Sequence, residues 1–114
     1  MAILPNAERA IIKSEKLQNY ILSSGHSIGR SKATFFRKFG YLPSNWEAFE
    51  KDLRKLIQSQ DAIESETFKF GIKYTVKGPL NSPSGETIQV LTVWVILKGE
   101  EFPRFVTAYS GGKK

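Results

Sequence analysis

The ionisable and nucleophilic side chains of this sequence set narrow limits on the chemistry it could perform. There is one histidine and no cysteine, which excludes a thiolate nucleophile and leaves too few ligands for an ordinary zinc site. Two close carboxylate pairs, Glu64 with Glu66 and Glu100 with Glu101, fit a solvated surface better than acid–base catalysis. The sequence contains no phosphate-binding loop or dinucleotide fingerprint, and we expect no metal and no cofactor.

His26 is the main candidate for proton transfer. It follows Gly25 in a short loop that closes at Gly29, and an unperturbed imidazole exchanges a proton near neutral pH. Arg30 and Lys32 follow within the next turn and a half, and two cations at a helix N-terminus suit a phosphate. The alternatives are an ordinary surface imidazole for His26 and a solvated helix face for Lys32.

A second set of candidates comes from the last two apolar runs. Thr92 is a polar side chain in the interior of the first run, and Arg104 opens the second, in which Thr107 and Tyr109 alternate. If the sheet face that carries Thr92 is open to a groove, these residues line it. The alternative for Thr92 is cross-strand packing, which is common for threonine in sheets.

Two aromatic residues complete the inventory, because Tyr74 and Trp94 would offer surfaces on which bases stack. One imidazole, several cations and a few hydroxyls are sufficient for metal-independent RNA cleavage. In that reaction a base activates the ribose 2′-OH, an acid protonates the leaving 5′-oxygen, and cations stabilise the phosphate charge. Few other hydrolytic reactions fit the same residues.

The run from Thr87 to Leu97 is the element around which the rest must be arranged. It is uncharged, lacks Gly and Pro, and is rich in β-branched residues, which predicts a strand. Alternation puts Thr92 and Trp94 on one face, and Leu91 and Val93 on the other. Both faces are apolar, so we expect a central strand that is covered on both sides or nearly so.

The first half of the chain predicts helices. Ser14 would cap a first helix that ends near Ser23, and a second would begin at Ser31 and end at Gly40 in the C′ position. A third would begin with the capping box Ser44–Glu47. Its apolar stripe consists of Trp46, Phe49, Leu53, Leu56 and Ile57.

After Asp61 the apolar pattern changes to a period of two, which predicts strands at 63–70 and 72–77. A loop at 78–85 leads into the central strand, and residues 104–109 return beside it as a hairpin. Helices first and strands afterwards predict an α+β fold, with N-terminal helices packed on one face of about four antiparallel strands. We expect residues 1–109 to form a single domain and residues 110–114 a flexible tail.

The charge distribution favours an anionic partner. The chain of 114 residues has a net charge of +6, and residues 1–60 hold ten Lys and Arg against five Asp and Glu. A basic face raises the odds of nucleic acid binding, although a high pI also keeps a small protein soluble. No signal peptide or membrane-spanning run occurs, so we expect a cytoplasmic protein without a membrane partner.

Short motifs distributed along the chain carry a resemblance to a known group of domains. The motifs are LPNAERA (4–10), GHSIGRSKATFF (25–36), FGY (39–41), NW (45–46), KY (73–74), GPL (78–80), TVW (92–94) and RFVTAY (104–109). Through them, from Leu4 to Tyr109, the chain resembles a bacterial domain family of unknown function, whose members occur alone or as the C-terminal part of secreted toxins. They look like distant members of the barnase–EndoU–colicin–RelE ribonuclease group, which packs N-terminal helices against a four-stranded antiparallel sheet.

The resemblance implies an endoribonuclease toxin that is held by an antitoxin or immunity protein, with RNA as its substrate and no DNA specificity. By motif position, the implied catalytic residues are His26, Lys32, Thr92, Arg104 and Thr107. We expect Arg30, Tyr74, Trp94 and Tyr109 to contact the substrate.

Two other functions fit the same sequence. A non-catalytic module could bind RNA or a protein through the basic helical half, and this binding would survive His26→Ala and weaken steeply with salt. An antitoxin-like or immunity protein is the other alternative. Such a protein would favour an acidic surface, so the net charge of +6 argues against it.

Overall fold

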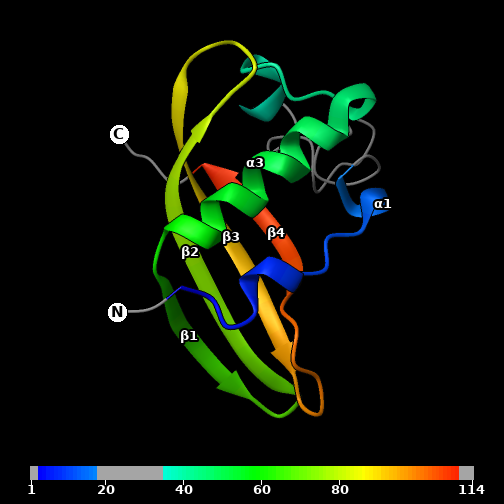
Figure 1. The fold of residues 1–114 in the computed structure, drawn as a ribbon, viewed down its shortest axis with the longest axis vertical. Coiled ribbons are helices and arrows are strands. Elements are labelled where there is room, and N and C mark those ends of the chain that lie inside the picture. Colours follow the sequence, from blue (N-terminus) through cyan, green and yellow to red (C-terminus); the bar gives the residue numbers. More distant parts are fainter. Residues whose placement is uncertain (1–2, 18–34, 111–114) are drawn as a thin grey trace.

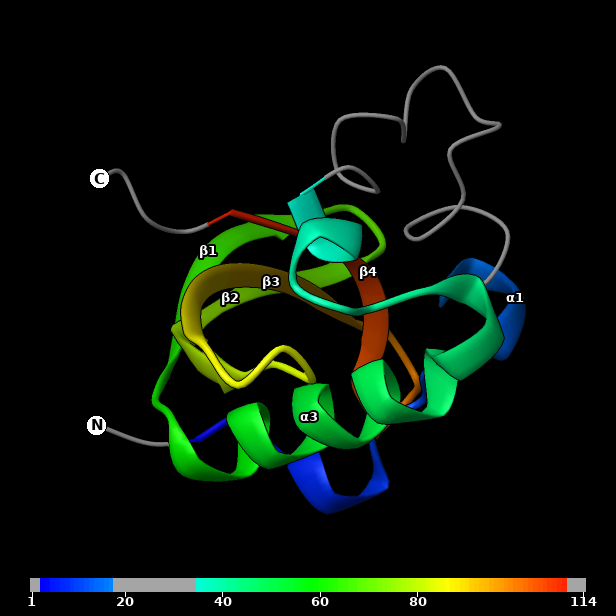
Figure 2. The same ribbon diagram turned by 90° about the horizontal axis from the view of Figure 1, so that it is seen from above.

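The computed structural model describes residues 3–17 and 35–110. An antiparallel sheet of four strands carries one long helix, α3 (Trp46–Ser59), on one of its faces. Figures 1 and 2 show α3 and the short 3-10 turn η1 (Ala7–Arg9) on the same side of the sheet. The predicted α+β fold with a four-stranded antiparallel sheet is confirmed.

The strands follow one another in the sheet as they do in the sequence. They are β1 (Ala62–Phe68), β2 (Gly71–Asn81), β3 (Thr87–Leu97) and β4 (Arg104–Ser110), in the order β1-β2-β3-β4. The central position of β3 and both of its ends agree with the sequence-based prediction. The turns β1–β2 and β3–β4 lie at the same end of the molecule (Figure 1), where the Lys98 N–H donates to the Phe70 carbonyl over 2.9 Å.

The predicted loop at 78–85 is wrong in its first half, because β2 continues to Asn81. Strand β1 begins at Ala62, opposite Val76, so β2 has a partner on one side only from Lys77 onward. An edge strand tolerates a proline. Gly78 permits this continuation. A Cβ at that position would lie 2.8 Å from Leu56 Cδ1, so the glycine lets β2 approach the end of α3 closely.

The start of α3 differs from the predicted capping box at Ser44–Glu47. A 3-10 turn, η3 (Pro43–Asn45), precedes the helix, and the Asn45 side chain ties the turn together. Its Oδ1 accepts from the Leu42 N–H over 2.6 Å, and its Nδ2 donates to the Gly40 carbonyl over 3.0 Å. Gly40 has a φ of 98°, which suits glycine as the predicted end of the preceding helix, whose described part covers residues 35–38.

The first predicted helix is described only as α1 (Ser14–Lys16), with Lys13 rather than Ser14 in the N-cap position. Before it, the chain runs parallel to β4. The Ile11 N–H donates to the Pro103 carbonyl, and the Phe105 N–H donates to the Ile11 carbonyl. This segment therefore adds a short fifth neighbour to the sheet, beside the beginning of β4.

The core lies between α3 and the sheet. The predicted stripe of α3 is confirmed, with Phe49, Leu53, Leu56 and Ile57 buried and Trp46 partly buried against them. They pack with residues from the sheet and from the first helical segments. These are chiefly Leu4, Leu17, Phe36, Tyr41, Val76, Leu80, Val90, Trp94 and Phe105.

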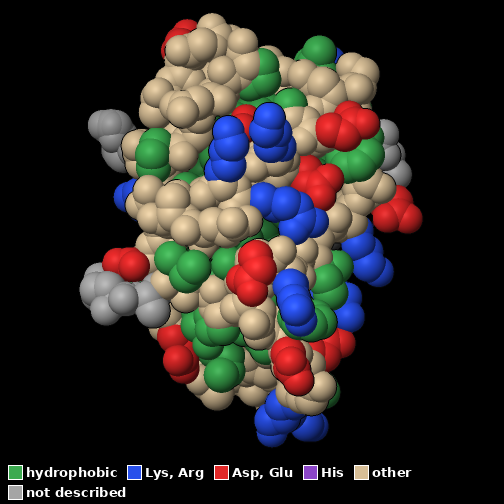
Figure 3. Space-filling model, viewed as in Figure 1, with side chains coloured by type: hydrophobic (Ala, Val, Ile, Leu, Met, Phe, Trp, Pro, Cys, Tyr) green, Lys and Arg blue, Asp and Glu red, His purple; other side chains and the backbone are tan. Residues whose placement is uncertain are grey.

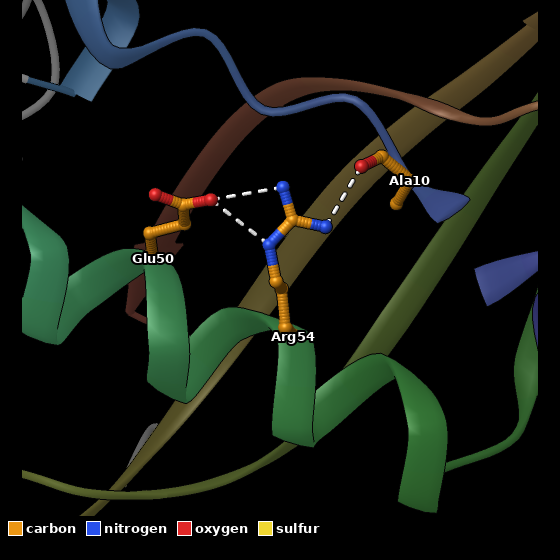
Figure 4. Close-up of polar contacts among 3 residues, drawn as sticks. All are labelled: Ala10, Glu50 and Arg54. Carbon is orange, nitrogen blue, oxygen red and sulfur yellow. Dashed lines mark hydrogen bonds and ion pairs between the residues drawn. The ribbon is translucent and has the colours of Figure 1, made fainter. Parts of the chain in front are cut away.

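Two polar contacts fix α3 in place. Figure 4 shows Arg54 between Glu50 and the N-terminal segment, where its Nη1 donates to the Ala10 carbonyl over 2.8 Å and its Nε donates to Glu50 over 2.9 Å. On the buried side of the helix, the Tyr41 hydroxyl donates to Asp52 over 2.6 Å. Burial, reinforced by this hydrogen bond, raises the pKa of Tyr41 well above its ordinary value.

Candidate functional site

The face of the sheet that α3 covers contains three of the predicted site residues. Thr92 and Trp94 are both 0 % exposed. The Thr92 hydroxyl donates to the Val76 carbonyl and accepts from the Trp94 indole N–H, each over 2.8 Å. Tyr74, which pairs with Trp94, is half-buried against the same core.

This arrangement corrects the expectation that the face with Thr92 opens to a groove. The hydroxyl of Thr92 is directed at partners within the core, and the ring of Trp94 packs against Phe105, with the ring centroids 5.2 Å apart. Thr92 therefore satisfies a buried indole N–H. Neither residue is in a position to touch a ligand at the surface, and we leave both out of the site proposed below.

The opposite face of the sheet gathers polar groups from β2 and β4. We call the set Lys73, Thr75, Lys77, Arg104, Thr107 and Tyr109 the outer face. Directly paired residues in antiparallel strands point to the same side, and the register places these six in three rows across β3. The rows are Lys73–Val95–Arg104, Thr75–Val93–Thr107 and Lys77–Leu91–Tyr109.

A β-bulge brings the β4 members of the outer face together. Val93 pairs with Thr107 and Trp94 pairs with Phe105, so Val106 is an extra residue on β4. Without it, Arg104 and Thr107 would point to opposite sides of the strand. The bulge thus places Arg104 on the same side of β4 as the hydroxyls of Thr107 and Tyr109. Lys73 and Lys77 of β2 lie two strands away, at roughly 10 Å.

The outer face is basic and half-exposed. Its lysines and its arginine are accompanied on the described strands by one acid, Glu66, whose Oε1 lies 3.4 Å from Lys73 Nζ. Lys77 is exposed and Tyr109 is 37 % exposed, whereas Val93 at the centre is 6 % exposed. A central apolar strip flanked by cations and hydroxyls suits a ligand that carries both negative charge and planar groups.

Arg104 is held in one orientation by Glu100, in the turn that precedes β4. Its Nε and Nη2 donate to the two carboxylate oxygens over 2.8 and 2.9 Å, the bidentate geometry that fixes a guanidinium most firmly. This hydrogen bonding lowers the pKa of Glu100 and raises the pKa of Arg104. The pair therefore stays charged over the whole physiological pH range.

Two hollows meet at Arg104. The larger one, of about 370 Å³, is lined among the described residues by Ile11, Gly99, Glu100, Glu101, Phe102 and Arg104. The second, of about 270 Å³, is lined by Ile11, Lys13, Arg104 and Phe105. Arg104, a predicted catalytic residue, thus lines two neighbouring concave surfaces.

The segment with His26, Arg30 and Lys32 lies outside the described residues. The predicted site residues do not include Lys13, Lys73, Thr75, Lys77 or Glu100. The alternation of Lys73, Thr75 and Lys77 was visible, but only the pairing with β4 shows that this alternation faces Arg104 and Thr107.

Residues 3–17 and 35–110 hold no cluster of three or more potential metal-ligating side chains. Within these same ranges, no helix combines the length and the apolar character needed to cross a membrane.

Comparison with known proteins places this chain in a family. The family described as Domain of unknown function (DUF6883) matches residues 3–112. The chain belongs to this family. No curated protein matches it.

A solved structure shares the fold. It is a chain of a complex described as a contact-dependent growth inhibition toxin with its immunity protein, from Klebsiella pneumoniae 342. The match has a TM-score of 0.68 and 16% sequence identity, and it covers 87% of this chain and 97% of the other. At this identity the similarity shows a common fold, and the α+β architecture fits it.

Proposed function

We propose that this domain is a toxin that cleaves RNA, and that the RNA lies across the outer face. The observation that carries the proposal is the convergence of Lys73, Lys77 and Arg104 with three hydroxyls over one apolar strand. Cations supply most of the affinity for a phosphate backbone, and the ring of Tyr109, the aromatic residue of the outer face, offers a surface on which an unpaired base stacks. The assignment to the barnase–EndoU–colicin–RelE group remains a prediction that this face supports.

The reaction needs few groups. The ribose 2′-oxygen attacks phosphorus and gives its proton to a base, the bond from phosphorus to the 5′-oxygen breaks, and an acid protonates that oxygen. The products are a 2′,3′-cyclic phosphate and a 5′-hydroxyl. We assign proton transfer to His26, phosphate binding to Lys32 and Arg104, and orientation of the phosphate to Thr107.

The alternative of a binding module that uses the helical half receives less support. Figure 3 shows Lys and Arg side chains interspersed with Asp and Glu on the face that α3 covers. Arg54 on this face is already paired with Glu50 over 2.9 Å. Mixed charges attract a polyanion less than a surface with an excess of one sign does. On the outer face Lys73 and Arg104 are also paired, with Glu66 and Glu100, but Lys77 is exposed and has no ion pair with any described residue, which leaves an excess of positive charge for RNA.

The proposed partner is an immunity protein or antitoxin that blocks the toxin until it reaches the cytoplasm of a target cell. The fold shared with a chain of a toxin–immunity protein complex supports this partner.

The test is cleavage of a defined RNA by purified protein in the presence of EDTA, with products analysed for a 2′,3′-cyclic phosphate. We expect cleavage by the wild type, a loss of at least 100-fold for His26→Ala, and a loss of about tenfold for Lys73→Gln or Lys77→Gln. The matched control is Lys51→Gln, which removes an exposed charge from α3. Intact RNA with correctly folded wild-type protein would refute the proposal, and binding without cleavage would favour the non-catalytic module.

A further inference from the structure

A second basic position lies next to Arg104, on the N-terminal segment. Ile11 pairs with Arg104 as a parallel neighbour, and Ile12 is 8 % exposed and belongs to the core. Lys13 has an extended backbone, with φ −78° and ψ 132°. Alternation along an extended segment therefore puts Lys13 on the side of Ile11, away from the core.

Lys13 and Arg104 line one hollow of about 270 Å³ together with Ile11 and Phe105, and no acidic residue is among its described lining. Lys13 is exposed and makes no ion pair with any described residue. Two cations on the wall of one hollow repel each other, and a bound anion removes that repulsion.

Arg104 is prepared for such a ligand. Glu100 uses its Nε and Nη2, whereas Nη1 donates no hydrogen bond to any residue in the described ranges. The guanidinium is thus fixed in orientation and keeps one nitrogen for a further acceptor. Glu100 lines the larger hollow rather than the one shared with Lys13.

We propose that Lys13 and Arg104 form an anion subsite in this hollow, and that it takes the backbone phosphate of the RNA next to the one that is cleaved, so that Arg104 contacts both phosphates. The size of the hollow is close to the lower end of ligand pockets, which suits a phosphate with part of its ribose. The identity of the ligand as RNA rests on the proposed function. The binding of a phosphate group by these two cations does not rest on it.

The first arm of the test uses inorganic pyrophosphate at low salt, followed by amide NMR shifts. We expect shifts at residues 11–13 and 99–105, and a dissociation constant at least fivefold higher for Lys13→Gln. Lys51→Gln, the matched control on α3, should bind as the wild type does. Lys13 is exposed, so its substitution should leave the melting temperature within about 2 °C.

The second arm uses uncleavable 2′-O-methyl oligonucleotides of two and eight nucleotides, with fluorescence anisotropy as the readout. We expect Lys13→Gln to weaken the longer oligonucleotide three- to tenfold and the shorter one less than twofold. The slope of log affinity against log salt should fall by about 0.7, the value for one lost contact to a single strand.

Three results separate the possibilities. Equal affinities of Lys13→Gln and wild type for both ligands would overturn the subsite. An effect on pyrophosphate with none on the oligonucleotides would overturn the RNA assignment and indicate a free phosphate compound as the ligand. Both binding effects without any cleavage by the wild type would support the subsite and refute only the proposed ribonuclease activity.

Discussion

Substitution of Thr92 tests whether this polar residue of the central strand has a structural or a chemical role. Its hydroxyl connects the Trp94 indole to the Val76 carbonyl in a fully buried setting. Thr92→Val keeps the shape of the side chain and removes the hydroxyl. We expect the variant to lose stability and to keep whatever activity the folded domain has.

The size of the effect follows from the two bonds. A buried polar group that loses its partner costs about 1–3 kcal/mol. The indole N–H of Trp94 would lose its acceptor entirely, and the Val76 carbonyl would lose one donor. We therefore expect a loss of about 2–3 kcal/mol in the free energy of unfolding. For a chain of 114 residues this corresponds to roughly 4 °C per kcal/mol, and hence to a drop of about 8–12 °C in melting temperature.

A double-mutant cycle with Trp94→Phe isolates the indole bond. In the Trp94→Phe background only the Val76 carbonyl loses a partner, so Thr92→Val should cost about 1 kcal/mol there, which gives a coupling of about 1–2 kcal/mol. Unfolding in urea at pH 7, followed by circular dichroism, measures all four corners. Thr75→Val on the outer face is the matched control and should stay within about 0.5 kcal/mol of the wild type.

The cleavage assay completes this test, at a temperature where every variant is folded. We expect kcat/KM of Thr92→Val within about twofold of the wild type. Unchanged stability combined with lost cleavage would refute the structural role and indicate a catalytic role for Thr92.

Three further predictions concern the scaffold. The pKa of Tyr41 is raised above its ordinary 10.0, so above pH 10 only the unfolded state loses this proton. The free energy of unfolding should therefore fall by up to about 1.4 kcal/mol per pH unit. Urea unfolding between pH 10 and 11 measures this slope, and Tyr41→Phe should remove the part that Tyr41 contributes. Gly71→Ala should lower the free energy of unfolding by more than about 2 kcal/mol, because its Cβ would meet the backbone of β3. The Cβ of Gly85→Ala would meet open space, at a φ of 93°, so this variant should lose only about 1 kcal/mol. Equal shifts in melting temperature for the two variants would contradict this contrast. Arg54→Met keeps the apolar stem and removes the bond to the Ala10 carbonyl, so it should lower the free energy of unfolding by about 1–2 kcal/mol; an unchanged urea midpoint would show that this bond contributes nothing.

The sequence predicted the strands of the sheet better than the point where β2 ends or the residue at which α3 begins. The run at 87–97 has one interpretation because β-branched residues fill it without interruption. Gly78 and Pro79 are typical turn residues, and local pattern gives no hint that they lie on an edge next to the end of α3. The helix start was misjudged for a similar reason, since Asn45 and Ser44 are both good capping residues and only the geometry of η3 selects Asn45.

The candidate site was predicted in part, and the reason lies in the pattern of β3. Both faces of this strand are apolar. Alternation therefore puts Thr92 and Val93 on opposite faces but does not show which of the two faces the helix covers. The assignment of Thr92 to the site assumed the uncovered face, and α3 lies on that face instead. Arg104 and Thr107 are three residues apart and would be assigned to opposite sides by alternation, until the extra residue Val106 brings them together. A bulge depends on the pairing between two strands, so one strand's sequence does not reveal it. The spacing of Thr92 and Trp94, two residues apart on a strand, was the available clue to their hydrogen bond, because a buried indole N–H requires an acceptor on its own face.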